Sequence, residues 1–374
     1  MIDQFTHHSE RDRYDPRRSY RWNYDHPPSW DAASHPGTNH AAEQAKSAEG
    51  ISSEQRWLPQ SGFTFLDIPV ASPLGIAAGP LLNGAWCLHY ASLGFDVLTY
   101  KTVRSVSREC YEMPNLVPVQ DETMTGSEQQ VAAQIAMDKT WAVSFGMPSS
   151  SPDVWRKDIE ETRSRLDPCK VLSVSVVGTH QAGWGLDELA EDYALCAKWA
   201  MESGADAIEA NFSCPNVDTC DGQLYQSARE SRMVASAIRR CIGEAPLIIK
   251  IGHVPEQSEA LELTSSLNGI VNGLSMTNSL AAAVIGQMGE PFFHGQKRGI
   301  CGEAIREVSV RQVARFHRVK KELGSEIHLI GVGGIHTSDH VKAYLDVGAS
   351  ACQLATSVMT DPQVGMKILS GLNH

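Results

Sequence analysis

Residues 327–338 read IHLIGVGGIHTS: a short apolar run, two consecutive glycines, and then residues suited to begin a helix. The apolar run predicts a buried strand, and a helix is expected to start near Thr337 or Ser338. Glycines at this junction leave backbone N–H groups open beside a helix N-terminus, an arrangement that binds phosphate. The segment therefore predicts one strand–helix unit with an anion-binding turn.

The same alternation of a short apolar run and an amphipathic stretch recurs from residue 58 onward. Eight runs are predicted to be strands: 74–78, 96–101, 171–177, 207–211, 246–250, 270–276, 327–332 and 351–355. Helical patterns are predicted at 185–203, 226–241, 255–267, 303–322 and 337–347. Eight such repeats favour an α/β fold of the closed (β/α)8 TIM-barrel type over an open doubly wound sheet.

A ninth short apolar run, 141–145, falls between the second and third predicted strands. We expect it to be an excursion within a long connection, in which residues 103–140 form a loop insertion over the barrel mouth. We number the strand that ends at Asn211 as the fifth and the strand that ends at Lys250 as the sixth, a count that holds to within one.

The first 57 residues differ from the barrel segment, 58–374, because no helical or strand period persists in them. One interpretation is a mobile tail. A second is an arm that lies over the body or over a partner subunit and is anchored by aromatic side chains, and a third is a tail with a separate function. These aromatic residues are Tyr14, Tyr20, Trp22, Tyr24 and Trp30.

Composition limits the class of protein. The 374 residues are 42% hydrophobic and 20% charged, which is typical of a globular chain, and the net charge of −12 disfavours a nucleic-acid partner. The nine cysteines form no CxxC motif, so we expect reduced thiols in a cytoplasmic protein and no structural zinc or iron–sulfur cluster. No apolar run approaches the roughly 18 residues of a membrane span, and the N-terminus lacks a secretory signal.

Polar residues gather where the predicted strands end, which is the active-site face of a TIM barrel. Lys101 closes the second strand and would point into the mouth, although a surface lysine is the alternative. Asn211 and Asn216 flank Cys214 on a proline-containing loop. Asparagine amides suit the imide or amide edges of a ring, and a cysteine can act there as acid–base or nucleophile. The alternative is a capped turn with a passive thiol.

The remaining strand ends indicate a cofactor. Lys250 can stabilise electron density on a bound ring, and the turns at Gly333–Gly334 and Ala355–Thr356, together with Gly302, predict a phosphate grip. No metal-ligand motif and no GxGxxG dinucleotide motif is present in the sequence. An organic cofactor with one phosphate, FMN, therefore fits best.

The ordered set of these segments resembles the dihydroorotate dehydrogenase family of FMN barrels over roughly residues 63–370. The matching segments are IAAGP, YKT, NFSCPN, IIK, TNS, GVGGI and ATS, of which NFSCPN is the most specific. A cysteine in this motif is similar to the soluble class, whereas the membrane-associated class has serine. The resemblance implies a small-molecule substrate, no membrane partner and a homodimer.

The resemblance also assigns roles. Cys214 would be the catalytic base in the oxidation of a C–C single bond beside a carbonyl, dihydroorotate to orotate in pyrimidine biosynthesis, or in the reverse reduction. The residues that would hold a pyrimidine-like ring are Lys101, Asn211, Asn216, Asn278 and Ser279, and backbone N–H groups around Gly146 are suited to bind an anion of the substrate. The residues that would hold FMN are Ala77, Ala78, Gly79, Lys101, Thr102, Asn211, Lys250, Thr277, Gly302, Gly333, Gly334, Ala355 and Thr356.

Two positions depart from the family pattern. Val143 stands where an asparagine helps to hold the substrate carboxylate, and Val119 stands where an arginine follows a proline. Losing one charge-assisted contact costs about 1.5–3 kcal/mol of binding free energy. A divergent member that acts on another dihydropyrimidine or on a specialised-metabolism substrate is therefore an alternative. Two further alternatives are a tRNA-type uridine reductase and a non-catalytic flavin-binding partner protein.

Overall fold

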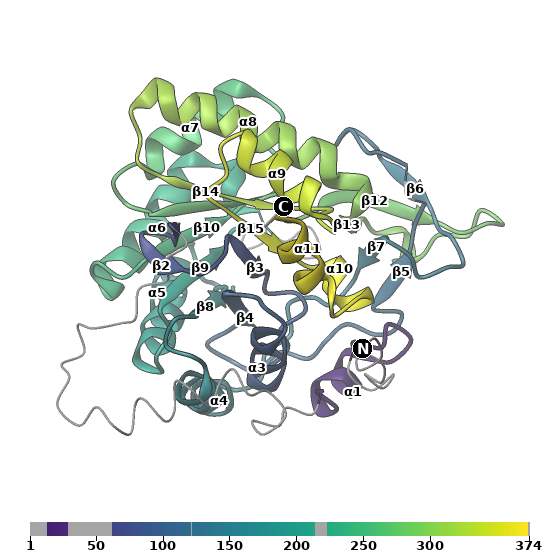
Figure 1. The fold of residues 1–374 in the computed structure, drawn as a ribbon, viewed down its shortest axis with the longest axis horizontal. Coiled ribbons are helices and arrows are strands. Elements are labelled where there is room, and N and C mark those ends of the chain that lie inside the picture. Colours follow the sequence, from purple (N-terminus) through teal and green to yellow (C-terminus); the bar gives the residue numbers. More distant parts are fainter. Residues whose placement is uncertain (1–12, 29–61, 121, 214–222, 373–374) are drawn as a thin grey trace.

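The described residues of a computed structural model, 13–28, 62–120, 122–213 and 223–372, contain a closed barrel of eight parallel strands (Figure 1). In ring order the strands are β3 (Leu74–Ile76), β4 (Val97–Val103), β8 (Val171–Val176), β9 (Ala207–Asn211), β10 (Leu247–Lys250), β11 (Gly273–Met276), β14 (His328–Val332) and β15 (Ala351–Leu354), which pairs with β3 again. The eight predicted strands and the TIM-barrel class are confirmed. The predicted numbering was one too high: Asn211 ends the fourth barrel strand and Lys250 the fifth.

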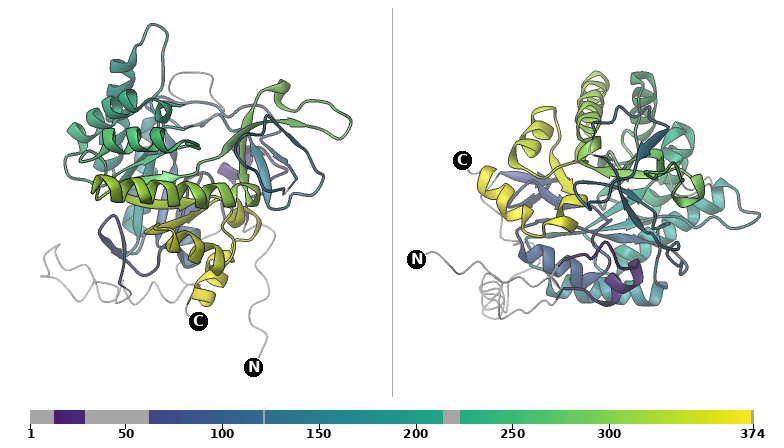
Figure 2. Two further views of the ribbon diagram at one scale, coloured as in Figure 1. Left: turned by 90° about the horizontal axis from the view of Figure 1, so that it is seen from above. Right: turned by 90° about the vertical axis from the view of Figure 1, so that its right-hand side faces the viewer.

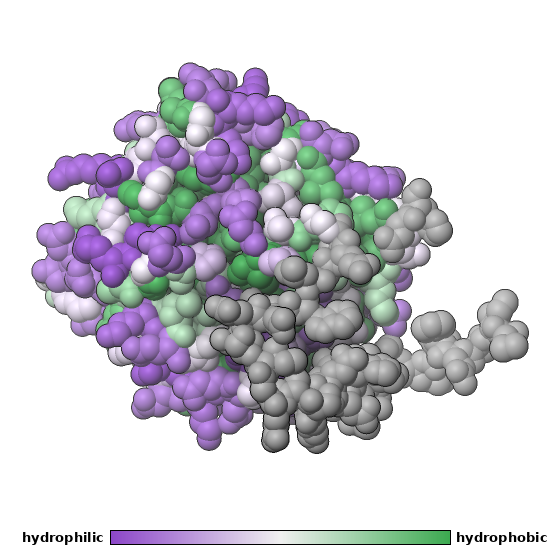
Figure 3. Space-filling model, turned by 60° about the vertical axis from the view of Figure 1, so that its left-hand side comes forward, coloured by the Kyte–Doolittle hydropathy of each residue, from purple (hydrophilic) through white to green (hydrophobic). Residues whose placement is uncertain are grey.

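Helices surround the barrel. They are α3 (Gly84–Ser92), α4 (Pro152–Arg165), α5 (Leu186–Glu202), α6 (Ala228–Ile242), α7 (Gln257–Leu267), α8 (Arg306–Leu323), α9 (Ser338–Asp346), α10 (Thr356–Thr360) and α11 (Val364–Leu372), with 3-10 turns η3 (Leu224–Gln226), η4 (Phe293–Gly295) and η5 (Glu303–Ile305). Their apolar sides face the strands, and hydrophilic side chains predominate on the face of the molecule that Figure 3 shows. The five predicted helices are confirmed.

Local sequence explains where several helices begin and end. The side chains of Asn83, Ser227 and Thr337 accept backbone N–H bonds at the starts of α3, α6 and α9. Gly324 ends α8 in the left-handed conformation, at φ 59°. Helix α3 was not predicted because seven of its nine residues are buried, so it shows no polar stripe.

A second sheet lies beside the barrel mouth (Figure 2). Its order is β5 (Leu116–Pro118), β7 (Thr140–Val143), β13 (Arg298–Gly302), β12 (Leu280–Ile285) and β6 (Gln130–Ala132). The expected insertion after β4 is present, but it carries strands and is not a loop alone. A second insertion, between β11 and α8, supplies β12 and β13 and was not predicted. In the first insertion, β5 and β6 have three residues each and are too short to show a period.

The amino end of the barrel is closed by a hairpin of β1 (Phe63–Phe65) and β2 (Ile68–Val70). Leu66 and Asp67 form its turn with φ of 50° and 66°. The side chains of Phe65 and Leu66 join a buried apolar cluster that includes Val97, Val171 and Ala207, the first residues of β4, β8 and β9. The hairpin therefore fills the end of the barrel opposite the site.

Residues 13–28, here called the arm, pack against the body and contain α1 (Tyr20–Asp25). The indole N–H of Trp86 donates to the carbonyl of Asn23 at 3.2 Å, and the amide of Asn83 donates to the carbonyl of Tyr24 at 3.0 Å. Tyr14 is only 1% exposed. In the described part of the extension, the chain thus follows the arm interpretation, while Trp30 lies outside the described residues.

Asn115 joins the arm to the second sheet, and its loss tests that connection. The buried amide donates to the carbonyls of Tyr111 and Ser144 at 2.9 and 3.2 Å, and its oxygen accepts the Tyr20 N–H at 3.1 Å. Asn115→Ala leaves these groups unsatisfied, so we expect the free energy of unfolding in urea to fall by about 2–4 kcal/mol. An unchanged unfolding midpoint would contradict this role for Asn115.

Candidate functional site

The carboxyl ends of the barrel strands bring the predicted residues to one rim. Backbone hydrogen bonds join the ends of neighbouring strands. The N–H of Ala77 donates to the carbonyl oxygen of Leu354 at 2.9 Å, and the N–H of Thr277 donates to the carbonyl oxygen of Val332 at 2.8 Å. The predicted residues on this rim are Ala77, Ala78 and Gly79 after β3, Lys101 and Thr102 in β4, Asn211 in β9, Lys250 in β10, Thr277 after β11, Gly333 and Gly334 after β14, and Ala355 and Thr356 after β15.

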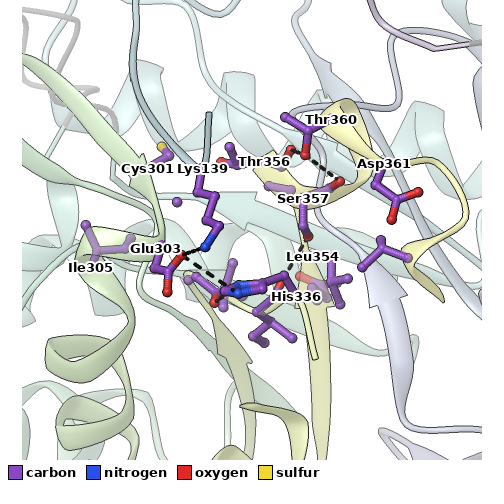
Figure 4. Close-up of a pocket in the computed structure, with 18 of the residues that line it drawn as sticks. Lys139, Cys301, Glu303, Ile305, His336, Leu354, Thr356, Ser357, Thr360 and Asp361 are labelled. Atoms are coloured by element: carbon purple, nitrogen blue, oxygen red, sulfur yellow. Dashed lines mark hydrogen bonds and ion pairs between the residues drawn. The ribbon is translucent and has the colours of Figure 1, made fainter. Parts of the chain in front are cut away.

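A cavity of about 270 Å³ opens between the last two barrel strands and the second sheet (Figure 4). Gly302, Gly333, Gly334 and Thr356 line it. Gly302 has φ 107°, and a Cβ atom there would lie 2.0 Å from the carbonyl oxygen of Lys139. Gly333 and Gly334 also have positive φ and close neighbours, so the three glycine positions disfavour any side chain and leave room for a ligand to approach the backbone.

Charged side chains surround Glu303 at the edge of this cavity (Figure 4). Its carboxylate lies 3.1 Å from the Lys139 ammonium, 3.1 Å from the Arg306 guanidinium and 3.8 Å from His336 Nε2. Burial opposes ionisation of Glu303, but hydrogen bonds from Lys139 and Arg306 outweigh it and lower the pKa of this carboxyl. Burial, with the nearby Arg306 charge, lowers the pKa of His340 to about 4. These groups were not predicted, because only the fold brings residue 139 beside residue 303.

A buried ion pair lies at the other side of the mouth. The Lys250 ammonium is 3.7 Å from the carboxylate of Glu209, and the side chain of Glu209 is 0% exposed. Neither Glu209 oxygen nor the Thr277 hydroxyl has a hydrogen-bond partner among the described residues. Buried polar groups of this kind normally have partners, so this set suits a polar ligand group at the rim. Glu209 was missed, although its one signal is a carboxylate inside the apolar run AIEAN.

Beneath the rim, polar side chains form a layer inside the barrel. The amide of Gln353 donates to the hydroxyl of Thr99 at 2.9 Å, and Ser275 donates to Gln353 at 3.5 Å. The Thr102 and Ser175 hydroxyls are 3.0 Å apart. Branched apolar side chains are the common filling of such barrels. A polar layer here instead provides hydrogen bonds below the mouth.

The predicted amides are also at the mouth. The Asn211 oxygen accepts the Ser213 N–H at 3.1 Å, and the Asn278 amide donates to the Ser213 carbonyl. Ser279 is 8% exposed and lines a second cavity of about 270 Å³. Cys214 and Asn216 lie outside the described residues, so their predicted places are not tested.

Lys101 is buried, with 7% of its surface exposed, and is not a surface lysine. Its ammonium lies 3.4 Å from the carbonyl oxygen of Gly79. It is also 4.6 Å from the ring centre of Phe145 and 5.0 Å from that of Tyr20. Cationic and aromatic side chains thus meet at the edge of the mouth.

The two departures from the family pattern have different surroundings. Val119 is 0% exposed and belongs to the apolar core of the second sheet, with Ala142 and Ile300. Val143 is half-buried at the end of β7, beside Gly146, which has φ 72°. Residue 119 therefore faces an apolar core, whereas residue 143 belongs to the segment predicted to contact substrate.

A buried arginine that the sequence analysis missed lies next to this segment. Arg298 is 8% exposed, and its Nε–H donates to the Ser144 hydroxyl at 2.8 Å. Two further N–H groups of Arg298 bond to the carbonyl of Lys297 and the side-chain oxygen of Gln296, at 2.9 and 2.8 Å. A guanidinium therefore approaches residues 143–146 from β13.

Two absences hold for the described residues. Among them, no group of three or more histidine, cysteine or acidic side chains is arranged to hold a metal ion. In the same part of the chain, no helix combines the length and apolar character that crossing a membrane requires.

Comparisons with known proteins agree with this geometry. Residues 62–374 match the family model described as dihydroorotate dehydrogenase. A dihydroorotate dehydrogenase from Dictyostelium discoideum is 31% identical over 327 residues, which cover 83% of this chain and 87% of the relative. The catalytic subunit of dihydroorotate dehydrogenase B (NAD(+)) from Enterococcus faecalis is 30% identical over 185 residues, which cover 49% of this chain and 57% of that relative.

A solved structure shares the fold. The crystal structure of DHODH from Eimeria tenella in complex with ferulenol superposes with a TM-score of 0.68 and covers 90% of each chain. Its identity of 17% supports the fold alone. The family model spans the barrel, the second sheet and every described residue of the rim. The chain therefore belongs to the dihydroorotate dehydrogenase family.

Proposed function

We propose that this chain is an FMN-dependent oxidoreductase that acts on a CH–CH bond beside a carbonyl, with dihydroorotate as the reference substrate. The observation that carries the proposal is one continuous rim with a glycine-lined cavity at one side and the buried Lys250 at the other. The family, whose members are generally FMN-dependent oxidoreductases, supports the same reading.

The described residues fit FMN. Gly333, Gly334 and Thr356 would hold the phosphate through backbone N–H groups, and glycine at residue 302 would keep that approach open. Lys250 and the unpartnered hydroxyl of Thr277 are suited to the polar edge of the ring. FMN, when bound, supplies the two-electron acceptor for a hydride.

The chain's own side chains would fix the substrate and move one proton. The Lys101 ammonium and the amides of Asn211 and Asn278 are donors suited to ring carbonyls. Cys214 would take the proton from the carbon next to the carbonyl, because its thiolate is a stronger base than a neutral serine hydroxyl. A free cysteine has a pKa of about 8.5, so nearby positive charge helps this step.

The contacts available to the substrate carboxylate suggest a second candidate substrate. The side chain of Val143 cannot donate a hydrogen bond, which favours an uncharged dihydropyrimidine over dihydroorotate. Arg298 lies beside the same segment and can compensate through its guanidinium. We propose dihydroorotate as the first substrate to test and dihydrouracil as its uncharged counterpart.

The glycine-lined cavity predicts how FMN affinity responds to one methyl group. In Gly334→Ala, the new Cβ would lie 2.5 Å from Cβ of Arg306 while the backbone keeps φ 66°. We expect the affinity for FMN, measured by fluorescence titration of flavin-free protein, to fall about tenfold or more. The control Gly324→Ala has a similar φ of 59° and an open surrounding, so it should keep its FMN affinity. Equal affinities in both variants would contradict the phosphate site.

The proposed base predicts a kinetic defect without loss of cofactor. Cys214→Ala should retain FMN but slow reduction of the bound flavin by dihydroorotate about 10²- to 10⁴-fold. Anaerobic stopped-flow absorbance measures this rate. The control Cys241→Ala removes an exposed thiol and should react like the wild type. A wild-type rate in Cys214→Ala would remove this thiol from the mechanism.

The departure at residue 143 predicts a change in substrate preference. Val143→Asn restores a hydrogen-bond donor, so the dissociation constant of orotate should fall about tenfold while that of uracil stays the same. Flavin difference spectra measure both constants. Val143→Leu serves as the apolar control. If Val143→Asn does not strengthen orotate binding, the carboxylate is not held at this segment.

A further inference from the structure

The arm reaches the rim of the proposed site through one residue. Tyr20 begins α1, is 7% exposed, and its ring centre lies 5.6 Å from that of Phe145. The ammonium of Lys101 is 5.0 Å from the Tyr20 ring centre and 4.6 Å from the Phe145 ring centre. A side chain from the N-terminal extension thus meets a side chain from β4 across the edge of the mouth.

Several contacts hold Tyr20 in this position. Its backbone N–H donates to the buried amide oxygen of Asn115, and the N-cap Ser19 fixes the first turn of α1 by accepting the Trp22 N–H at 3.1 Å. Tyr14 packs its ring against Phe145 at 6.4 Å between centres. The arm is therefore attached on both sides of Tyr20, and the ring cannot swing away without breaking buried contacts.

Two aromatic rings beside one buried ammonium have a defined effect. The negative face of each ring attracts the cation, and the attraction grows where water is excluded. A lysine side chain otherwise has several rotatable bonds and many positions for its ammonium. The rings of Tyr20 and Phe145 therefore restrict where the Lys101 charge can be.

We propose that Tyr20 is a positioning residue for Lys101, so that the arm forms one wall of the substrate compartment. The ligand class, a dihydropyrimidine or related cyclic imide whose carbonyl faces Lys101, rests on the proposed function. The positioning of Lys101 by the Tyr20 ring does not depend on it, because the contact is present in the chain itself.

The first experiment examines Lys101 directly, with no substrate. Acetic anhydride labels accessible amines, and mass spectrometry gives the rate for each lysine. In Tyr20→Leu, Lys101 should be labelled about fivefold faster than in the wild type, because the ring no longer covers and attracts its ammonium. Tyr20→Phe keeps the ring face and should label like the wild type. Trp22→Leu removes a ring from the same helix that stacks on His26, and should leave Lys101 unchanged.

The second experiment examines function. In the FMN-loaded protein, Tyr20→Leu should raise the dissociation constants of orotate and uracil about tenfold, as read from flavin difference spectra, while Tyr20→Phe and Trp22→Leu stay within about twofold. In a Lys101→Met background, Tyr20→Leu should add no further loss, because Tyr20 acts through Lys101. Thermal unfolding of each variant identifies any that fail to fold.

The outcomes separate the two proposals. Faster labelling of Lys101 in Tyr20→Leu alone supports the positioning role. An unchanged rate in Tyr20→Leu, or an equal rise in Trp22→Leu, overturns it. If the labelling changes as expected but neither orotate nor uracil perturbs the flavin spectrum, the positioning role stands and the proposed substrate class is wrong.

Discussion

Closure of eight parallel strands into one hydrogen-bonded ring is the constraint on which the site depends. Each strand must run in the same direction, so all the carboxyl ends lie on one rim. Residues far apart in the sequence then become neighbours: Gln353 donates to Thr99 across 254 positions. The lysines, amides and glycines of the rim are placed by this ring, and the two insertions and the arm are built around it.

Buried charge is concentrated where the ring opens. Lys250 is paired with Glu209, Lys101 lies against aromatic rings, and Arg298 donates to Ser144 and two further oxygen atoms. Burying a charge costs several kcal/mol unless partners replace the lost water, and each of these cations has such partners. The site thus offers three cations in three distinct settings, which suits a ligand with several different polar edges.

The sequence allowed the barrel strands and five outer helices to be predicted, because the strands are short apolar runs and the helices show an amphipathic period. The short strands β5 and β6 were not predicted, since three residues show no period. Helix α3 was not predicted because it is buried on all sides. Among the site residues, Lys101 and Lys250 were found because they end apolar strands. Glu209, Arg298 and the contact between Tyr20 and Lys101 were missed, because only the folded chain brings these residues to their partners.

Gly302 belongs to the second sheet and not to the barrel, which has a consequence for assembly. It faces Thr140 across the pairing of β13 with β7, so one side of the glycine-lined cavity exists only after the two insertions have paired. An anion bound there would bridge the sheet and the last two barrel strands. Binding of the anion would then hold the second sheet against the barrel, and the binding free energy would add to the stability of that junction.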